Sequence, residues 1–445
     1  MANHLSPIPL YWSVLEENMP GDMIESSLHV HEGSLFVSGK QIKINSKINI
    51  LAYGKASMLM YKSARKIIGD EYFGKGLLIT HEDRNLQEMD SNKEVVVRST
   101  HPLITESSYI AGNKAKEFVE NGPDNDILLA LISGGGSAMV VLPIDTISLR
   151  DKIKFISKVM HMSVPEREVN VLKKSLSKIK GGKLAELATE KTIVNCIVSD
   201  ERNHQISAIS SGMTVCNELI DPIDVMDTYK LWGVAENPVK KALLNHGRVT
   251  GIGCDKNIIN KIVGSRDNLI SSFIKRHAEF GFDSINFIAN MHSCTPEDAA
   301  NNLIEKFYKY YDSASCGKHL VVSTGEVQVN AEQFPNAKGG RNQHLVALLM
   351  LKFKPEFDFF FAAIATDGMD YLDGVHGAYY DSQMNQIVSR NKDFIQSNIS
   401  ELNSYNIHKE LKTLIEGSKT GTNMSDVFLF TFEKLGQNEN SINCN

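Results

Sequence analysis

Short apolar runs recur along the chain at wide intervals, and their length predicts buried β-strands. Many are apolar at every position rather than at alternate positions, which is typical of strands covered on both faces of a sheet. The predicted strands span residues 48–53, 76–80, 95–99, 126–133, 192–199, 284–289, 319–323, 357–366 and 426–432.

The segments between several of these runs carry helical spacing. Residues 107–120 form one predicted helix, with Thr105 as a candidate N-cap, and residues 342–352 form another. Strands that alternate with helices are typical of the α/β class with a parallel sheet. Residues 217–257 carry little pattern and contain two proline dipeptides, so we expect an excursion near a domain boundary there.

Composition narrows the class of protein. The 445 residues are 42% hydrophobic and 22% charged with a net charge of −6, which argues against a nucleic-acid binder and against attraction to a membrane surface. The six cysteines show no CxxC spacing, so neither a zinc ribbon nor a disulfide framework is expected. No apolar run approaches the ~18 residues of a membrane helix, and no secretory signal opens the chain. We expect a cytoplasmic protein.

The strongest local motif directly follows the predicted strand 126–133. It consists of Ser133, Gly134, Gly135, Gly136 and Ser137. Three successive glycines let backbone N–H groups approach an anion closely, so the loop favours phosphate binding, although a tight turn without a ligand is the alternative. The motif is neither GxGxxG with a following acid nor GxxxxGK[ST], which argues against a dinucleotide site.

Two further glycine pairs have basic neighbours. The pair Gly181-Gly182 lies among Lys173, Lys174, Lys178, Lys180 and Lys183. This segment either binds a polyphosphate or is a solvated basic helix with a break. The pair at 339–340 is flanked by Lys338 and Arg341 at the start of a predicted helix, where an anion is favoured. The alternative is a loop whose basic residues bind nothing.

Acidic and polar residues follow several predicted strands. Asp200, Glu326 and Asp367 each stand at a strand end, where ligands bind in open α/β sheets. One or two such carboxylates suffice for Mg²⁺ on substrate phosphates, and a helix cap or turn is the alternative for each. Lys55 follows strand 48–53 and suits a γ-phosphate, while Thr422 and Asn423 precede the last strand.

Taken together and in this order, the motifs resemble those of the class II glycerate kinases, the glycerate 2-kinases with a MOFRL C-terminal domain. The resemblance spans roughly residues 49–430. The matching pieces are GKAS from Gly54, HP from His101, LISGGGSA from Leu131, LSKIKGGKLA from Leu176, SD at Ser199, SG at Ser211, GE at Gly325, KGGRNQHL from Lys338, TDG from Thr366 and TGTN from Thr420 with Asp426.

The resemblance implies a fold and an activity. It implies a Rossmann-like parallel-sheet domain over residues 1–255, a smaller MOFRL-like α/β domain over 256–445, and an active site in the cleft between them. The implied reaction is ATP-dependent phosphorylation of D-glycerate at its 2-hydroxyl, with a small molecule as partner, no nucleic acid, and a monomer or homodimer as the assembly. The family's important charged residues map onto Lys55, Asp200, Arg341 and Asp367.

These roles form a working hypothesis. Residues 133–137, together with Lys180, Gly181, Gly182, Lys183, Thr422 and Asn423, hold ATP. Mg²⁺ is held by Asp367. Substrate-binding residues are Lys55, Arg341, Glu326 and His204, and Asp200 accepts or orients the hydroxyl proton.

Four loops depart from the family pattern. His204 stands where the family has a second acid, residues 371–373 replace a glycine–proline–threonine, and His376 replaces a small residue. The segments 324–329 and 417–419 also depart from the family pattern. Three alternatives therefore stay open. The acceptor is glycerate, the acceptor is another hydroxy acid, or the protein binds nucleotide with little catalysis. An oxidoreductase is disfavoured by the absence of a dinucleotide fingerprint.

Overall fold

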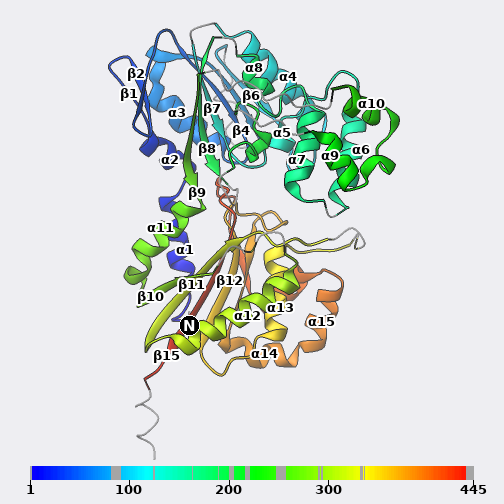
Figure 1. Ribbon diagram of the computed structural model, residues 1–445. Helices are drawn as coiled ribbons and strands as arrows, with labels where there is room; N and C mark the ends of the chain where they lie inside the picture. The colour runs from blue at the N-terminus through cyan, green and yellow to red at the C-terminus, as the bar shows by residue number, and fades with distance from the viewer. Residues whose placement is uncertain are drawn as a thin grey trace, which may run out of the picture. The chain divides into compact units, whose positions relative to one another are not determined.

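The computed structural model describes residues 3–81, 92–123, 126–162, 164–188, 190–199, 205–215, 221–246, 257–288, 291, 294–330, 334 and 336–436. The chain forms two compact units (Figure 1). The first is Met19–Ser265, and the second combines Met1–Asn18 with Arg266–Asn445. We predicted a boundary at residues 255 and 256; the units instead divide after Ser265, and the N-terminal residues join the second unit.

The first unit is built on a six-stranded sheet whose strands all run parallel, in the order β6-β5-β4-β7-β8-β9 (Figure 1). The chain fills one half of the sheet from β4 to β6 and then the other half from β7 to β9. The strand order therefore reverses between β4 and β7, and the predicted Rossmann-like fold is confirmed. The strands are β4 (Ile48–Tyr53), β5 (Phe73–Thr80), β6 (Glu94–Arg98), β7 (Ile127–Ile132), β8 (Thr192–Ser199) and β9 (Ile258–Ser265).

The central strands are continuously apolar because helices cover both faces. Every residue of β4 and β7 is buried. Helix α3 packs on β4 and β5, and α4 packs on β5 and β6. The predicted N-cap Thr105 begins α4 with a reciprocal capping box that includes Ser108. The helices of this unit are α2 (Pro20–Ser27), α3 (Ser57–Tyr72), α4 (Glu106–Glu120), α5 (Gly136–Met139), α6 (Leu149–Met160), α7 (Glu166–Ser175), α8 (Lys183–Glu186), η1 (Ile209–Ser211), α9 (Pro222–Thr228), η2 (Leu231–Gly233) and α10 (Asn237–His246).

Two parts of the first unit differ from the sequence prediction. The described part of residues 217–257 is helical: α9, η2 and α10 pack with α6 and α7 in one apolar cluster. These helices are too short to show a clear period in the sequence. A small antiparallel sheet also precedes β4. Its strands are β1 (Leu28–His31), β2 (Ser34–Val37) and β3 (Lys40–Lys43).

The second unit carries a mixed six-stranded sheet in the order β10-β11-β15-β12-β13-β14. β10 and β11 are parallel, whereas β15 runs antiparallel to both β11 and β12. A continuous apolar run shows that both faces of a strand are covered but does not show its direction, so the sequence left this mixture unresolved. The strands are β10 (Ser284–Phe287), β11 (Gly317–Gly325), β12 (Phe359–Ala365), β13 (Val375–Asp381), β14 (Leu414–Glu416) and β15 (Asp426–Lys434).

Residues on both faces of this sheet are buried, and helices α12 and α13 cover one of the faces. Phe359, Phe361 and Phe430 join a core with α12 and α13, and the alternate residues Phe360 and Leu429 are buried as well. Helix α1 packs on α11 (Figure 1). The helices are α1 (Ile8–Glu17), α11 (Arg266–Arg276), η3 (His277–Phe280), α12 (Pro296–Ser313), α13 (Arg341–Lys352), η4 (Ser382–Met384), α14 (Asn385–Arg390), α15 (Lys392–Ser400) and α16 (Ser404–Leu411).

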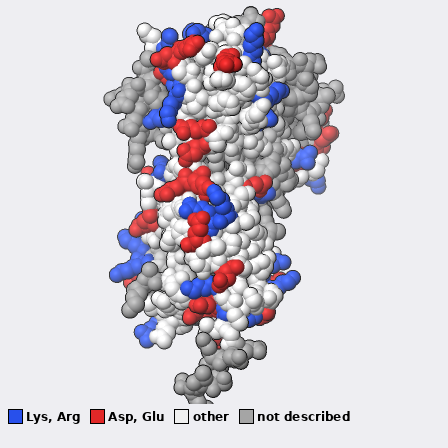
Figure 2. Space-filling view, turned by 90° about the vertical axis from the view of Figure 1, so that its left-hand side faces the viewer, with Lys and Arg blue, Asp and Glu red and all other residues white. Residues whose placement is uncertain are grey.

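The molecular surface carries charges of both signs. On the face that Figure 2 presents, acidic and basic side chains are interspersed among larger uncharged areas. Among the helices that the structure describes, none is long and apolar enough to span a bilayer.

Candidate active-site residues

Two loops follow the adjacent strands β4 and β7 at the point where the strand order reverses. Lys55 lies in the first loop, and its backbone N–H donates to the Gly134 carbonyl at 2.9 Å. The Ala56 N–H donates to Ser133 Oγ at 3.0 Å. These bonds fix Lys55 beside the glycine loop, at the position where open α/β sheets bind ligands.

The glycine loop presents free backbone donors. Among the hydrogen bonds between described residues, none is donated by the N–H groups of residues 134–137. Gly135 is left-handed, with φ +86°, and a Cβ there would lie 3.0 Å from Lys55 Cγ and from His101 Cδ2. The loop therefore needs glycine for both conformation and space, and its N–H groups are placed to bind an anion.

Ser210 supports the glycine loop from η1. Its hydroxyl donates to the Ser133 carbonyl at 2.6 Å, and the residue is 5% exposed. Ser210, Ser211 and Gly212 are three successive residues with positive φ. Sequence reasoning did not identify Ser210 as a site residue, because neither its residue type nor its position predicts this contact.

Replacing Gly136 by alanine should displace the loop. The new Cβ would lie 2.4 Å from Ser210 Oγ and 2.8 Å from Tyr53 Cδ2. Because a misplacement of about 1 Å can cost about 100-fold in rate, we expect kcat/KM for ATP to fall by about that factor. Gly233→Ala is the matched control, since a Cβ there meets nothing within 4 Å. Adding Ser210→Gly should partly restore the rate, and an unaffected Gly136→Ala enzyme would contradict the proposed loop function.

In the predicted phosphate-binding segment 180–183, several hydrogen-bond donors are already bonded to carbonyls of the protein. The N–H groups of Gly181 and Gly182 donate to the carbonyls of Ser211 and Gly212, at 2.9 and 2.7 Å. The Lys183 ammonium donates to the carbonyls of Lys174 and Ser177, at 2.9 and 2.6 Å. These bonds hold the end of α7 and the turn after it, as lysines near helix C-termini do. The binding role of Gly181, Gly182 and Lys183 stays a prediction.

Lys180 lies at the glycine loop itself. Its ammonium donates to the Ser137 carbonyl, and the side chain is 1% exposed. Burial, with a smaller contribution from Lys173, lowers the pKa of Lys180 from 10.5 to about 7. A bound phosphate would oppose this effect, because a nearby anion favours the charged form of lysine.

In the second unit, the ends of three neighbouring strands carry the predicted residues. Gly325 pairs with Asp426, which pairs in turn with Ala365, so the ends of β11 and β12 lie beside the start of β15. The Arg341 guanidinium, at the start of α13, donates from Nε and Nη2 to both carboxylate oxygens of Asp426, at 2.6 and 3.0 Å, and from Nη1 to Glu326 at 2.9 Å.

Arg341 is therefore neutralised within its own unit. Asp426 is 1% exposed, and burial raises its pKa from 3.8 to about 7, against the lowering effect of Arg341. Asp370 accepts the N–H groups of Asn342 and Gln343 at the first turn of α13, at 3.0 and 2.9 Å. Carboxylates outnumber cations in this group, so it suits a hydroxyl or a cation better than a free anion.

Asp367 follows β12 in a braced turn. Its Oδ1 accepts the Met369 N–H at 3.0 Å, and its carbonyl accepts the Thr420 N–H at 3.3 Å. The Thr420 hydroxyl donates to the Thr366 carbonyl at 2.6 Å. Thr422 and Asn423 follow in the same loop and are buried. The structure thus places Asp367, Thr422, Asn423, Glu326 and Arg341 in one unit.

Two of the divergent loops contact each other. His376 on β13 lies against the 417–419 segment, and its Nε2 is 3.0 Å from the Ser418 carbonyl. Its ring also meets the edge of Trp12 of α1, with ring centroids 5.1 Å apart. Tyr371 is instead 75% exposed. His376 and residues 417–419 are therefore one packed feature, whereas Asp200 and His204 lie outside the described residues.

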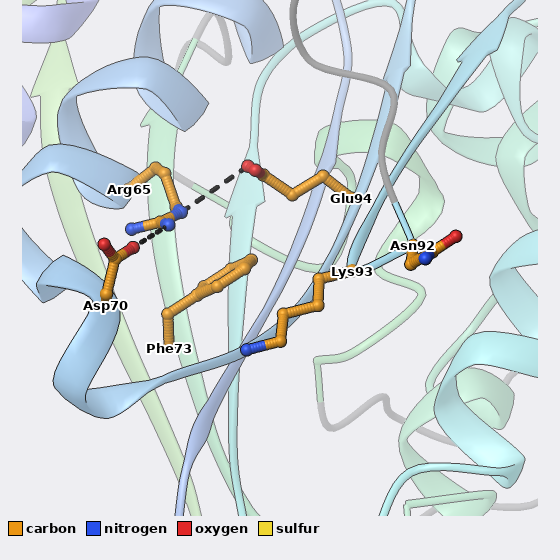
Figure 3. A pocket seen from close by; sticks show the side chains of 6 residues that line it. All are labelled: Arg65, Asp70, Phe73, Asn92, Lys93 and Glu94. Atoms are coloured by element: carbon orange, nitrogen blue, oxygen red, sulfur yellow. Dashed lines mark hydrogen bonds and ion pairs between the residues drawn. The ribbon is translucent and has the colours of Figure 1, made fainter.

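A polar hollow of about 380 Å³ lies at the amino ends of β5 and β6 (Figure 3). The Arg65 guanidinium stacks over the Phe73 ring at 4.0 Å, pairs with Asp70, and lies 3.5 Å from Glu94. Arg65, Asp70 and Glu94 pair with one another in this hollow. The hollow lies at the opposite end of the strands from the glycine loop, so we assign it no part in the site.

The fold and these loops define an α/β protein with a glycine loop at the switch point of a Rossmann-like sheet. Comparison with known families agrees with this class. The chain belongs to the family described as Domain of unknown function (DUF4147), whose model matches residues 9–244, and the MOFRL family model matches residues 319–426. The family membership predicted from the motifs is confirmed.

Several relatives cover nearly the whole chain. A glycerate 2-kinase of Picrophilus torridus is 28% identical over 88% of this chain and 90% of its own length. A glycerate 2-kinase of Pyrococcus horikoshii is 25% identical over 92% of this chain and 93% of its own. The crystal structure of a glycerate kinase from Thermotoga maritima matches the fold with a TM-score of 0.76 at 21% identity, covering 96% of this chain and 98% of that one.

Proposed function

We propose that this protein is a kinase that transfers the γ-phosphoryl group of ATP to the 2-hydroxyl of D-glycerate, giving 2-phosphoglycerate and ADP. The observation that carries the proposal is the glycine loop with unoccupied N–H donors beside Lys55 at the switch point of the first sheet. The named activity of the relatives, glycerate 2-kinase, supplies the acceptor and implies ATP as the donor.

The first unit supplies the phosphate-binding groups. The N–H groups of residues 134–137 bind phosphate oxygens without side chains in the way, and Lys180 adds an ammonium at Ser137. Lys55 acts as a point charge on the transferring phosphoryl group. Asp200, which follows β8, orients or accepts the hydroxyl proton. Catalysis of this kind is mostly positioning and electrostatic stabilisation.

The second unit supplies acidic groups and the acceptor-binding residues. Mg²⁺ prefers oxygen ligands and uses one or two carboxylates with substrate phosphates, which fits Asp367 and the surplus of carboxylates around Arg341. When bound, the ion neutralises charge on the phosphates. No group of three or more metal-binding side chains occurs among the described residues. Arg341 contributes to acceptor binding by holding Asp426 and Glu326 in place for a hydroxyl of the acceptor, and Thr422 and Asn423 donate to ATP.

One observation favours an acceptor other than glycerate. His376 replaces a small residue of the family pattern, and it packs between Trp12 and the Ser418 carbonyl in the unit that holds Asp367. This addition of ring volume would change the shape of an acceptor pocket there. A hydroxy acid related to glycerate is therefore the second candidate.

The test is ADP release by the purified protein with Mg-ATP and a panel of small hydroxy acids. We expect turnover with D-glycerate to exceed turnover with every other acid. Turnover only with a different acid would replace the acceptor, and ATP binding without turnover would favour a nucleotide-binding protein. A parallel assay for NADH oxidation with hydroxypyruvate should show no change in absorbance.

ATP binding should take up protons at pH 8. Lys180 is mostly neutral at that pH in the free protein, because burial lowers its pKa to about 7. A phosphate at the glycine loop would raise that pKa and protonate the amine. Calorimetry in buffers of different ionisation enthalpy should show uptake of up to about one proton per ATP, by the linkage of proton and ligand binding. Lys180→Met should abolish the uptake; equal uptake by that variant would remove Lys180 from the phosphate site.

A further inference from the structure

The N-terminal segment is fixed onto the second unit, although it precedes the first unit in the chain. Asn3 donates to Asp381 at 3.0 Å, and the Thr431 hydroxyl donates to the Leu5 carbonyl at 2.6 Å. Lys275 of α11 pairs with Glu17 at 3.0 Å. Helix α1 is therefore part of the unit that carries Asp367 and Arg341.

Tyr11 of α1 brings an unpartnered hydroxyl to this unit. The residue is 1% exposed, and its hydroxyl has no hydrogen-bond partner among the described residues. Burial raises the pKa of Tyr11 well above 10, and the nearby carboxylates of Asp367 and Asp426 raise it further. The group therefore remains a protonated phenol, able to donate.

Ring packing places α1 beside the Asp367 turn independently. Trp12 contacts the His376 ring at 5.1 Å between centroids. His376 Cε1 lies 3.1 Å from the position of a Cβ on Gly368, the residue after Asp367. The neighbour of Tyr11 in the helix is thus one side chain away from the turn that carries the carboxylate.

Other buried polar groups of this unit also have no partner in the described part of the chain. The Asn342 amide, on the first turn of α13, has no partner at either atom and is 0% exposed. The hydroxyls of Thr422 and Ser425, in the loop before Asp426, are likewise buried and unpartnered. Buried polar groups without partners are unfavourable and uncommon, so these groups of the second unit are candidate contacts for a polar ligand.

We propose that the Tyr11 hydroxyl binds the acceptor, donating a hydrogen bond to its C3 hydroxyl, while that C3 hydroxyl donates a hydrogen bond to the carboxylate of Asp367 or Asp426. This rests on the proposed function and names the residue that recognises the acceptor. A hydroxyl both accepts and donates, so it fits between a phenol and carboxylates, where an anion would be repelled. The C3 hydroxyl suits this subsite better than C2, because a donor on the attacking oxygen would withdraw electron density from it.

The test compares the binding of D-glycerate and D-lactate, which lacks the C3 hydroxyl, to the wild-type protein and Tyr11→Phe by calorimetry. Loss of one hydrogen bond to a neutral group corresponds to about tenfold in affinity. We expect Tyr11→Phe to weaken D-glycerate about tenfold and to leave D-lactate unchanged. In turnover, KM for D-glycerate should rise and KM for ATP should not.

Tyr380→Phe is the matched control. Its hydroxyl is buried in the same unit but has hydrogen-bond partners: it donates to Asn385 Oδ1 at 2.5 Å, and the Phe353 carbonyl lies 3.2 Å away. Tyr380→Phe should lower Tm and leave D-glycerate binding unchanged. Tyr11→Phe should leave Tm unchanged or raise it, because it removes a buried polar atom without a partner. A fall in Tm as large as that of Tyr380→Phe would make the Tyr11 hydroxyl structural and overturn the proposal.

The remaining outcomes separate this inference from the proposed function. An active wild-type enzyme with equal D-glycerate affinity in Tyr11→Phe overturns the subsite and leaves the kinase function standing. The expected binding pattern without phosphoryl transfer supports the subsite and overturns the kinase function. A wild-type protein that does not bind D-glycerate overturns both.

Discussion

Replacing Arg341 by alanine should inactivate the protein and also destabilise it. The guanidinium makes two bonds to the buried Asp426 carboxylate, which would be left in the protein interior without its counter-charge. Removing one partner of a buried ion pair typically costs 3–5 kcal/mol, and because Arg341 is itself one-third exposed we expect about 3 kcal/mol. We expect turnover to fall about 10²–10³-fold as well. Denaturant unfolding and ADP release measure the two effects separately.

The destabilisation should depend on pH in a defined direction. The pKa of Asp426 is already raised from 3.8 to about 7, chiefly by burial. When folding raises the pKa of an acid, the acid contributes stability at every pH below its pKa in the unfolded chain. This contribution is lost as the pH rises through its pKa in the folded protein. Loss of Arg341 raises the pKa of Asp426 in the folded protein further. The deficit should therefore be small at pH 5 and largest above pH 7.

A double variant separates the charge effect from the catalytic one. Arg341→Met with Asp426→Asn removes both charges, so the free energy of unfolding should recover most of its loss while turnover stays low. If Arg341→Ala has the wild-type free energy of unfolding at pH 8, the ion pair between Arg341 and Asp426 does not stabilise the fold.

Lys55→Ala should lose activity while the stability of the fold is retained. The backbone of Lys55 joins the two switch-point loops through the bond to Gly134. Alanine keeps that bond and removes the ammonium proposed to hold the transferring phosphoryl group. We expect kcat to fall about 10²–10³-fold with Tm close to that of wild type, because alanine keeps the backbone bond to Gly134.

Lys62→Ala is the matched control for this variant, because Lys62 is exposed on the neighbouring helix α3. It should retain wild-type kcat. Single-turnover measurements on both variants distinguish a slower chemical step from weaker ATP binding. A Lys55→Ala enzyme with kcat near that of wild type would remove Lys55 from the reaction.

The sequence predicted the first unit better than the second for a physical reason. Buried parallel strands such as 48–53 and 126–133 are continuously apolar, and the glycine loop follows directly on the second of them, so pattern and motif coincide locally. β13 carries His376 and Gly377 within its seven residues, and β14 has only three residues, so neither gives a strand pattern.

The parts of the site that were missed depend on contacts between distant segments. Tyr11 reaches the second unit only because the N-terminal segment folds back onto it, and no local pattern predicts that. Asp426 was seen as part of a motif, but its pairing with Arg341 joins residues 85 positions apart. At Gly181-Gly182 the motif suggested open donors, whereas the structure shows that loop 211–212 accepts both N–H groups.

The most direct test of the central claim is the phosphorus and proton NMR spectrum of the product formed from D-glycerate and Mg-ATP. We expect stoichiometric ADP and a single phosphomonoester whose phosphorus couples to the C2 proton, which identifies 2-phosphoglycerate. Coupling to the C3 protons, or no phosphomonoester from D-glycerate under conditions in which ATP is bound, would contradict the claim.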